Sequence, residues 1–214
     1  MLDFTVIMVT IGLVFLAVPP IAWWFYRKYP ANPDQRYRTF WPRLWASITD
    51  ALVVIVLSFI PQNFTNFYPA VWDTALWLAV ILGVWGYPAI TWFYSIFLHG
   101  RFGQTVGKMA TRVRVVNSLT EEQITFRHAL LRDCVPILLS IPLLIYNSYL
   151  LLIESPVRES SALNELANWT IYIRLIWWLV ELITMLTNDK RRAVHDFIAG
   201  TVVVRTNIDE GEDD

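Results

Sequence analysis

Five apolar segments, each long enough for a helix to cross a bilayer, constrain the fold of this chain more than any other feature. They run approximately over residues 4–26, 43–60, 73–98, 129–153 and 169–187, and a spanning helix needs roughly 20 residues. Hydrophobic residues make up 56% of the chain and charged residues 16%, against about 25% charged in an ordinary soluble domain. The sequence therefore predicts an all-α, polytopic membrane bundle of about five transmembrane helices.

The charges between these segments predict their orientation. Lys and Arg concentrate after the first, third and fifth segments, whereas residues 61–72 carry none and residues 154–168 carry only Arg158. Cytoplasmic loops hold the excess of Lys and Arg in membrane proteins. We therefore expect a multi-pass protein of the cell (inner) membrane, with its N-terminus outside and its C-terminus in the cytoplasm.

Two short segments on the expected cytoplasmic side have the character of β-strands. Residues 112–116 alternate charged and apolar side chains, and residues 201–205 are β-branched. We expect them to pair as a small β-ribbon beneath the membrane. Because an isolated two-stranded ribbon is only marginally stable, it should rest on the adjoining helix ends.

Two carboxylates lie inside apolar segments at similar expected depths. A carboxylate at the bilayer centre costs roughly 2.5–3.5 kcal/mol on insertion scales, so such residues usually face the bundle interior. Asp50 and Glu181 are therefore expected to face a common interior site, with Arg43 at its cytoplasmic mouth and Arg174 on its outer side. In the alternative, Glu181 bonds Arg174 or a neighbouring hydroxyl and only fixes packing.

Three separated motifs occur in a distinctive order. Arg43 and Asp50 lie in the second apolar segment, Gly103-Gln-Thr-Val-Gly-Lys108 precedes the first strand, and Asp196 lies before the second. With these motifs the sequence resembles the RDD family of membrane proteins, which is named for one arginine and two aspartates. The resemblance implies an integral membrane protein, for which transport is often suggested and no ligand is settled.

The resemblance covers roughly residues 37–206 and divides the chain into three parts. Residues 1–36 form an N-terminal transmembrane helix and basic loop, residues 37–206 form the RDD-like membrane domain, and residues 207–214 are expected to be an acidic disordered tail. The glycine-containing motif before the first strand is expected to form a tight turn. A phosphate-binding loop requires G-x-x-x-x-G-K-[ST], and here Phe102 and Met109 replace its first and last residues.

The sequence offers no enzyme, metal or cofactor site. Its single cysteine, Cys134, and its scattered histidines lack the spacing of metal ligands. The adjacent His195 and Asp196 are best interpreted as a structural hydrogen-bonded pair. The net charge of −1 also argues against a nucleic-acid binder.

Two classes of function remain. The first is a small transporter or ion- or proton-coupled carrier, with the ion pathway formed from Arg43, Asp50, Glu181, Asp196, Arg174 and His195. The second is a non-transporting scaffold that assembles other membrane proteins. The lipid bilayer is the expected environment in both, together with a homo-oligomer or a membrane-protein partner. Lys190, Arg191 and Arg192 either anchor the topology or contact anionic lipid.

Overall fold

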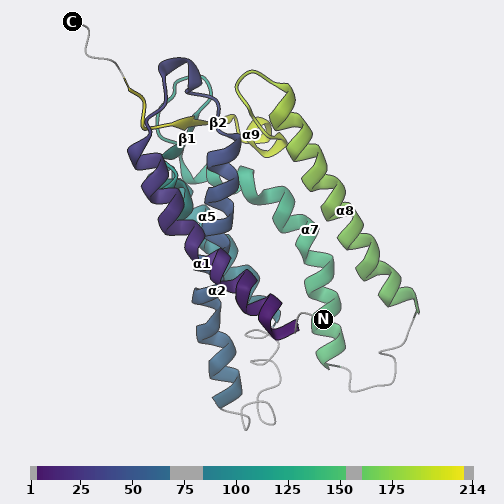
Figure 1. The fold of residues 1–214 in the computed structure, drawn as a ribbon. Coiled ribbons are helices and arrows are strands. Elements are labelled where there is room, and N and C mark those ends of the chain that lie inside the picture. Colours follow the sequence, from purple (N-terminus) through teal and green to yellow (C-terminus); the bar gives the residue numbers. More distant parts are fainter. Residues whose placement is uncertain (1–3, 68–83, 153–160, 210–214) are drawn as a thin grey trace, which may run out of the picture.

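The computed structural model describes residues 4–67, 84–152 and 161–209, and it is mostly helical. The long helices run side by side, and the short helices and two strands gather at one end (Figure 1). The long helices are α1 (Phe4–Lys28), α2 (Phe40–Phe67), α5 (Gly86–Phe102), α7 (Phe126–Leu152) and α8 (Ser161–Thr187). The short elements are η1 (Pro33–Gln35), α6 (Val106–Ala110), α9 (Val194–Ile198), β1 (Val113–Asn117) and β2 (Thr201–Arg205).

The helical membrane architecture expected from the sequence is confirmed. Three of the described helices are long and apolar enough to cross a membrane, over Phe40–Ser58, Phe126–Tyr149 and Asn168–Thr187. The expected segment 73–98 is represented by α5 only from Gly86 onward, and its residues 73–83 lie outside the described part of the chain. The structure therefore supports three of the five expected spans by length and composition.

The predicted ribbon is also confirmed. β1 pairs antiparallel with β2, with Val113 opposite Arg205 and Asn117 opposite Thr201. Each face of the ribbon is buried. One face packs with Ile124, with Ala129 of α7 and with Ile96 of α5, and the other packs against Tyr37. This helix support explains how only two strands can form a stable sheet.

The segment after α1 and the segment after β2 are hydrogen-bonded to each other at the ribbon end of the molecule. The Asn207 carbonyl accepts from the Ala31 N–H at 2.8 Å, and the Asp209 N–H donates to the Ala31 carbonyl at 2.9 Å. Residues 207–209, at the start of the expected tail, are thus bound to the segment that follows α1. Residues 210–214 lie outside the described part.

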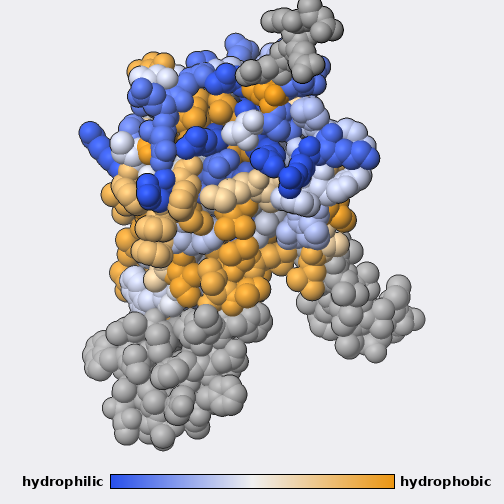
Figure 2. All heavy atoms as spheres, turned by 90° about the vertical axis from the view of Figure 1, so that its left-hand side faces the viewer, coloured by the Kyte–Doolittle hydropathy of each residue, from blue (hydrophilic) through white to orange (hydrophobic). Residues whose placement is uncertain are grey.

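Hydrophilic and hydrophobic residues separate along the long axis of the molecule. On the face toward α1, hydrophilic residues surround the ribbon end and a hydrophobic belt lies below them (Figure 2). We call the hydrophilic end, made of η1, α6, α9, β1 and β2, the cap. The belt is the surface that a bilayer would cover, so the cap lies at the membrane boundary.

Candidate functional site

Asp50 binds the segment between α5 and the ribbon. Its Oδ1 accepts hydrogen bonds from the Tyr94 hydroxyl at 2.6 Å and from the Gly107 N–H at 2.7 Å, and its Oδ2 accepts from the Thr105 hydroxyl at 2.6 Å. All three donors are neutral. Asp50 of α2 thus holds α5 and α6 in place through three hydrogen bonds.

The local sequence explains why this segment can approach Asp50. Gly103 ends α5 with a φ of 68°, and Thr105 caps α6 in an extended conformation. A Cβ at Gly107 would lie 2.1 Å from the Ala46 carbonyl oxygen and 2.9 Å from Asp50 Cγ. The expected tight turn is therefore formed only at Gly103. The rest of the motif forms α6, which lies against α2.

Asp196 is the centre of a second cluster. Arg43 Nη1 donates to its Oδ2 at 2.7 Å, and Arg132 Nη1 forms a short contact with its Oδ1. The Ala193 N–H donates to Oδ2 at 3.0 Å, and the Thr201 hydroxyl donates to Oδ1 at 3.3 Å. The Asp196 side chain is 0% exposed. One carboxylate therefore joins α2, α7, α9 and β2.

The neighbouring guanidiniums keep Asp196 ionised. Burial alone would raise the pKa of Asp196, but Arg132 and Arg43 outweigh burial and hold the pKa well below its ordinary value. Arg43, expected at the mouth of a site shared by Asp50 and Glu181, instead pairs with Asp196. Its side chain is only 10% exposed and turns inward, because a buried carboxylate is within reach.

His195 connects this cluster to α8. Its Nδ1 lies 2.7 Å from Glu181 Oε2, its backbone N–H donates to Glu181 Oε1 at 3.1 Å, and its Nε2 lies 2.9 Å from Arg132 Nη2. An arginine can only donate, so His195 Nε2 accepts from Arg132, whereas Glu181 Oε2 has no hydrogen-bond partner in the described structure. The expected hydrogen bond between the side chains of His195 and Asp196 is not formed, since His195 Nε2 and Asp196 Oδ1 are 3.6 Å apart.

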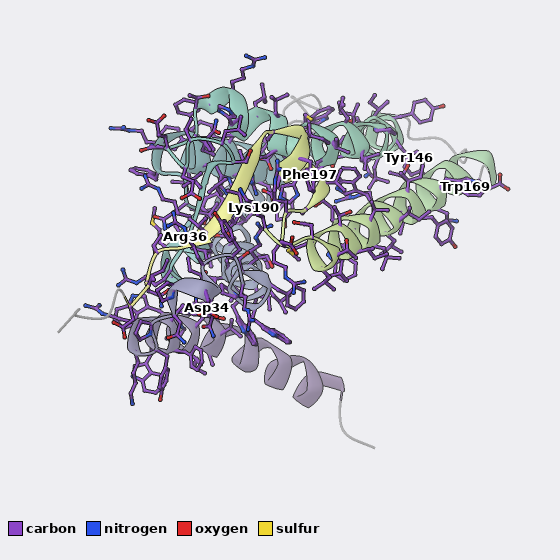
Figure 3. The ribbon with its side chains drawn as sticks, turned by 90° about the horizontal axis from the view of Figure 1, so that it is seen from above. Asp34, Arg36, Tyr146, Trp169, Lys190 and Phe197 are labelled. Atoms are coloured by element: carbon purple, nitrogen blue, oxygen red, sulfur yellow. The ribbon has the colours of Figure 1, made fainter. Side chains whose placement is uncertain are left out.

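The expected carboxylate pair between Asp50 and Glu181 is not formed either. Asp50 binds α5 and α6, whereas Glu181 binds His195. Arg174 is exposed on α8, and it forms no ion pair within the described residues. Seen from above, Trp169 of α8 lies far to one side of the cap residues Asp34 and Arg36 (Figure 3). The expected common depth did not bring the carboxylates together, because each accepts hydrogen bonds from different elements.

Lys108 lies between the two clusters. Its Nζ contacts His99 Nε2, and His99 Nδ1 lies 2.9 Å from the Ser95 carbonyl oxygen. Burial and the charges of Arg132 and Arg43 together lower the pKa of Lys108 to about 7, and Asp50 and Asp196 offset only part of that shift. Lys108 therefore lies within electrostatic reach of both clusters.

The basic run after α8 is partly used inside the protein. Arg192 Nε donates to the Thr201 carbonyl at 2.9 Å, its Nη2 donates to the Asp196 carbonyl at 3.1 Å, and its guanidinium lies 4.1 Å from the Phe197 ring centroid. Lys190 remains exposed, with its Nζ 5.6 Å from the Tyr37 ring centroid. Arg192 thus fixes α9 against β2, and lipid contact by this run stays a prediction.

Sequence reasoning missed Arg132 and Tyr94, and it interpreted the motif that contains Thr105 and Gly107 only as a tight turn. Arg132 carried a usable signal, because it is an ionisable residue inside the fourth apolar segment, and such residues face partners. Tyr94 resembles an ordinary helix residue until α2 is placed beside it.

Three cavities of the described structure lie away from the carboxylates of the network. Asp50, Asp196 and Glu181 are absent from their linings. Among the described residues, no three or more His, Cys, Asp or Glu side chains form a group suited to a metal ion. Asp50 and Asp196 are thus bound by other parts of the same chain, whereas Arg43 Nη2 and Glu181 Oε2 are buried without a hydrogen-bond partner in the described structure.

Comparison with known proteins supports the family resemblance. The model of the RDD family matches residues 37–200, which include Arg43, Asp50 and Asp196. No curated protein and no solved structure matches the chain.

Proposed function

The chain belongs to the RDD family, and from this premise we propose that it is a membrane scaffold that binds a second membrane protein, rather than a single-chain carrier. The observation that carries this proposal is that the carboxylates of Asp50 and Asp196 are bound by other parts of the same chain. A carrier needs its carboxylates to meet a hydrated pathway. Here Asp196 is fully buried against Arg43 and Arg132, and Asp50 holds α6.

Helix α8 supplies the surface that a partner would bind. Only 6% of its Asn168–Thr187 span is buried, against 22% of the Phe40–Ser58 span of α2. Its exposed apolar side chains include Ile171, Leu175, Ile176, Trp178, Leu179 and Ile183. Such a helix can be covered by lipid, so exposure alone does not select a partner.

Arg174 gives this surface its specificity. It is exposed on α8 roughly 9 Å below Asn168, in the outer half of the expected span. An arginine at the centre of a spanning helix costs roughly 2.5–3.5 kcal/mol on insertion scales, and such residues usually pair. We therefore propose that the partner carries an Asp or Glu at this depth in one of its own transmembrane helices.

Site-specific photo-cross-linking in native membranes tests this function. A photoreactive side chain at Trp178 should give an adduct of one defined mass, and the same side chain at Phe93, an exposed residue of α5, should not. Arg174→Gln should lower the adduct yield about tenfold, which corresponds to loss of about 1.4 kcal/mol. Arg174→Lys should retain most of it. Equal adducts at both positions, or a yield unaffected by Arg174→Gln, would contradict the scaffold.

One observation favours proton-coupled transport as a second candidate. Lys108 has a pKa of about 7 and contacts His99, so the network contains a group that can exchange a proton near neutral pH. This candidate requires proton flux into vesicles that contain the purified protein. Lys108→Met should abolish that flux, whereas Lys190→Met should preserve it. Absence of flux in the wild type, or equal flux in both variants, rejects transport.

A further inference from the structure

Two cavities meet on the side of the molecule where α1 packs against α2. The first has a volume of about 490 Å³ and an apolar lining that runs from Ala17 to Tyr26 of α1, with Trp45 of α2. The second has a volume of about 500 Å³ and lies toward the cap, where Arg38 and Arg205 join its lining. Both cavities include Phe25, Tyr26 and Trp45. Together they form one groove, here called the α1–α2 groove, with an apolar end and a basic end.

The α1–α2 groove lies at the level where a phospholipid would sit at the membrane boundary. From Ala17 to Phe25 it extends along α1 by roughly 12 Å. Its basic end lies beside aromatic residues, which prefer the headgroup level of a bilayer. On this face of the molecule the hydrophilic cap meets the hydrophobic belt (Figure 2). An acyl chain beside the apolar end would therefore place its headgroup at the basic end.

The basic end presents the guanidiniums of Arg38 and Arg205. Arg205 is partly buried, and its Nε has no hydrogen-bond partner in the described structure. Its guanidinium lies 5.6 Å from the Tyr26 ring centroid, and Arg38 is exposed on the same cavity. No carboxylate lines this cavity. Phosphate oxygens are strong acceptors for such guanidiniums.

Another cavity of the cap also contains arginines, but its lining includes carboxylates as well. It has a volume of about 250 Å³, and Asp34 and Asp189 line it together with Arg38 and Arg191. Two carboxylates there oppose an anionic ligand, and the cavity lacks the long apolar end. The comparison favours the α1–α2 groove.

We propose that the α1–α2 groove binds an anionic glycerophospholipid from the cytoplasmic leaflet. One acyl chain lies along α1 beside Ala17 and Ile21. The phosphate receives hydrogen bonds from Arg205 and Arg38. The lipid would thereby join the N-terminal helix to the second strand, which carries Arg205.

Lipid titration of the full-length protein in detergent tests this proposal. Native mass spectrometry and thermal unfolding should show tight binding and a raised Tm with phosphatidylglycerol, and weaker effects with phosphatidylcholine. Inorganic phosphate alone should do neither, because it lacks the acyl chain. The double variant Arg38→Gln/Arg205→Gln should bind phosphatidylglycerol about 30-fold more weakly, since each basic residue near an anionic surface contributes roughly a factor of five.

Two further variants separate the parts of the site. Arg101→Gln/Arg127→Gln removes the same charge from exposed residues elsewhere on the molecule, and it should leave binding unchanged. Ala17→Phe fills the apolar end of the groove and should weaken the binding of both lipids to the same extent. Equal phosphatidylglycerol affinity in the two double variants would overturn the proposal. So would a shift in Tm with phosphate alone that equals the shift with lipid.

Discussion

The three residues that name the RDD family divide into two different roles in this chain. Arg43 and Asp196 form a buried ion pair, to which Arg132 adds a second guanidinium. Asp50 instead accepts from the neutral donors Tyr94, Thr105 and Gly107. The sequence located these residues along their helices, but the direction of each side chain around its helix depends on packing. The pairing of Arg43 with Asp196 therefore followed only from the structure.

Lys108 makes the stability of the folded protein depend on pH. Its pKa is about 7 in the folded protein against 10.5 for an ordinary lysine. Between these values the unfolded chain binds more protons than the folded chain, so the free energy of unfolding rises with pH across this window and is level beyond it. Thermal unfolding from about pH 6.5 to about pH 10 should show this rise in the wild type.

The matched variants for this measurement are Lys108→Met and Lys190→Met. Lys108→Met should flatten the rise, because the group with the lowered pKa is gone. Lys190 is exposed, so its removal should leave the rise intact. The same slope in the wild type and in Lys108→Met would mean that Lys108 is not the group responsible.

At the scale of elements, the ribbon could be predicted and α6 could not. Residues 112–116 and 201–205 carry the alternation and β-branching of strands, and these signals are local. α6 has five residues, too few for a helical period to be visible in the sequence. It is fixed by the Thr105 cap and by the contact of Gly107 with α2. A contact of that kind becomes visible only when two distant segments are brought together.

Gly107→Ala tests the packing of α6 on α2. The added Cβ would lie 2.1 Å from the Ala46 carbonyl oxygen, so α6 must move away and weaken its hydrogen bond to Asp50. We expect a loss of about 1–3 kcal/mol in the free energy of unfolding, as overpacking usually costs. Val106→Ala, at the exposed neighbouring position, should change it by less than about 0.5 kcal/mol. Equal stability of the two variants would show that α6 does not require this close approach.

At the scale of the whole molecule, the segments with positive charge converge on one end. The strands, α9 and the segment between α1 and α2 all gather at the cap, as expected for loops on one side of a membrane (Figure 1). The three motifs correctly indicated the family. The helical architecture followed from hydropathy, and the convergence of the charged segments at one end is what their charge predicts. The sequence did not predict the placement of α8, which depends on how α7, α8 and α9 pack.

Cysteine labelling tests the orientation of the cap. In a Cys134→Ser background, Ser118→Cys lies in the expected cytoplasmic part and Glu165→Cys in the expected outer loop. A membrane-impermeant maleimide added to intact cells should label the position at 165 and not the position at 118. After permeabilisation both should react. Labelling at 118 alone in intact cells would reverse the orientation, and with it the assignment of the lipid groove to the cytoplasmic leaflet.

The central claim is that the Arg43–Asp196 ion pair ties the second span to the C-terminal segment, and a double-mutant cycle measures it directly. The free energy of unfolding is compared for the wild type, Arg43→Met, Asp196→Asn and the double variant in one detergent. Asp196→Asn should cost about 3–5 kcal/mol, because it leaves the buried guanidiniums of Arg43 and Arg132 without their carboxylate. Arg43→Met should cost less, because Arg132 still pairs with Asp196. The double variant should cost less than the sum, by about 1 kcal/mol or more. Strictly additive costs would mean that the two residues stabilise the protein independently, and would contradict the claim.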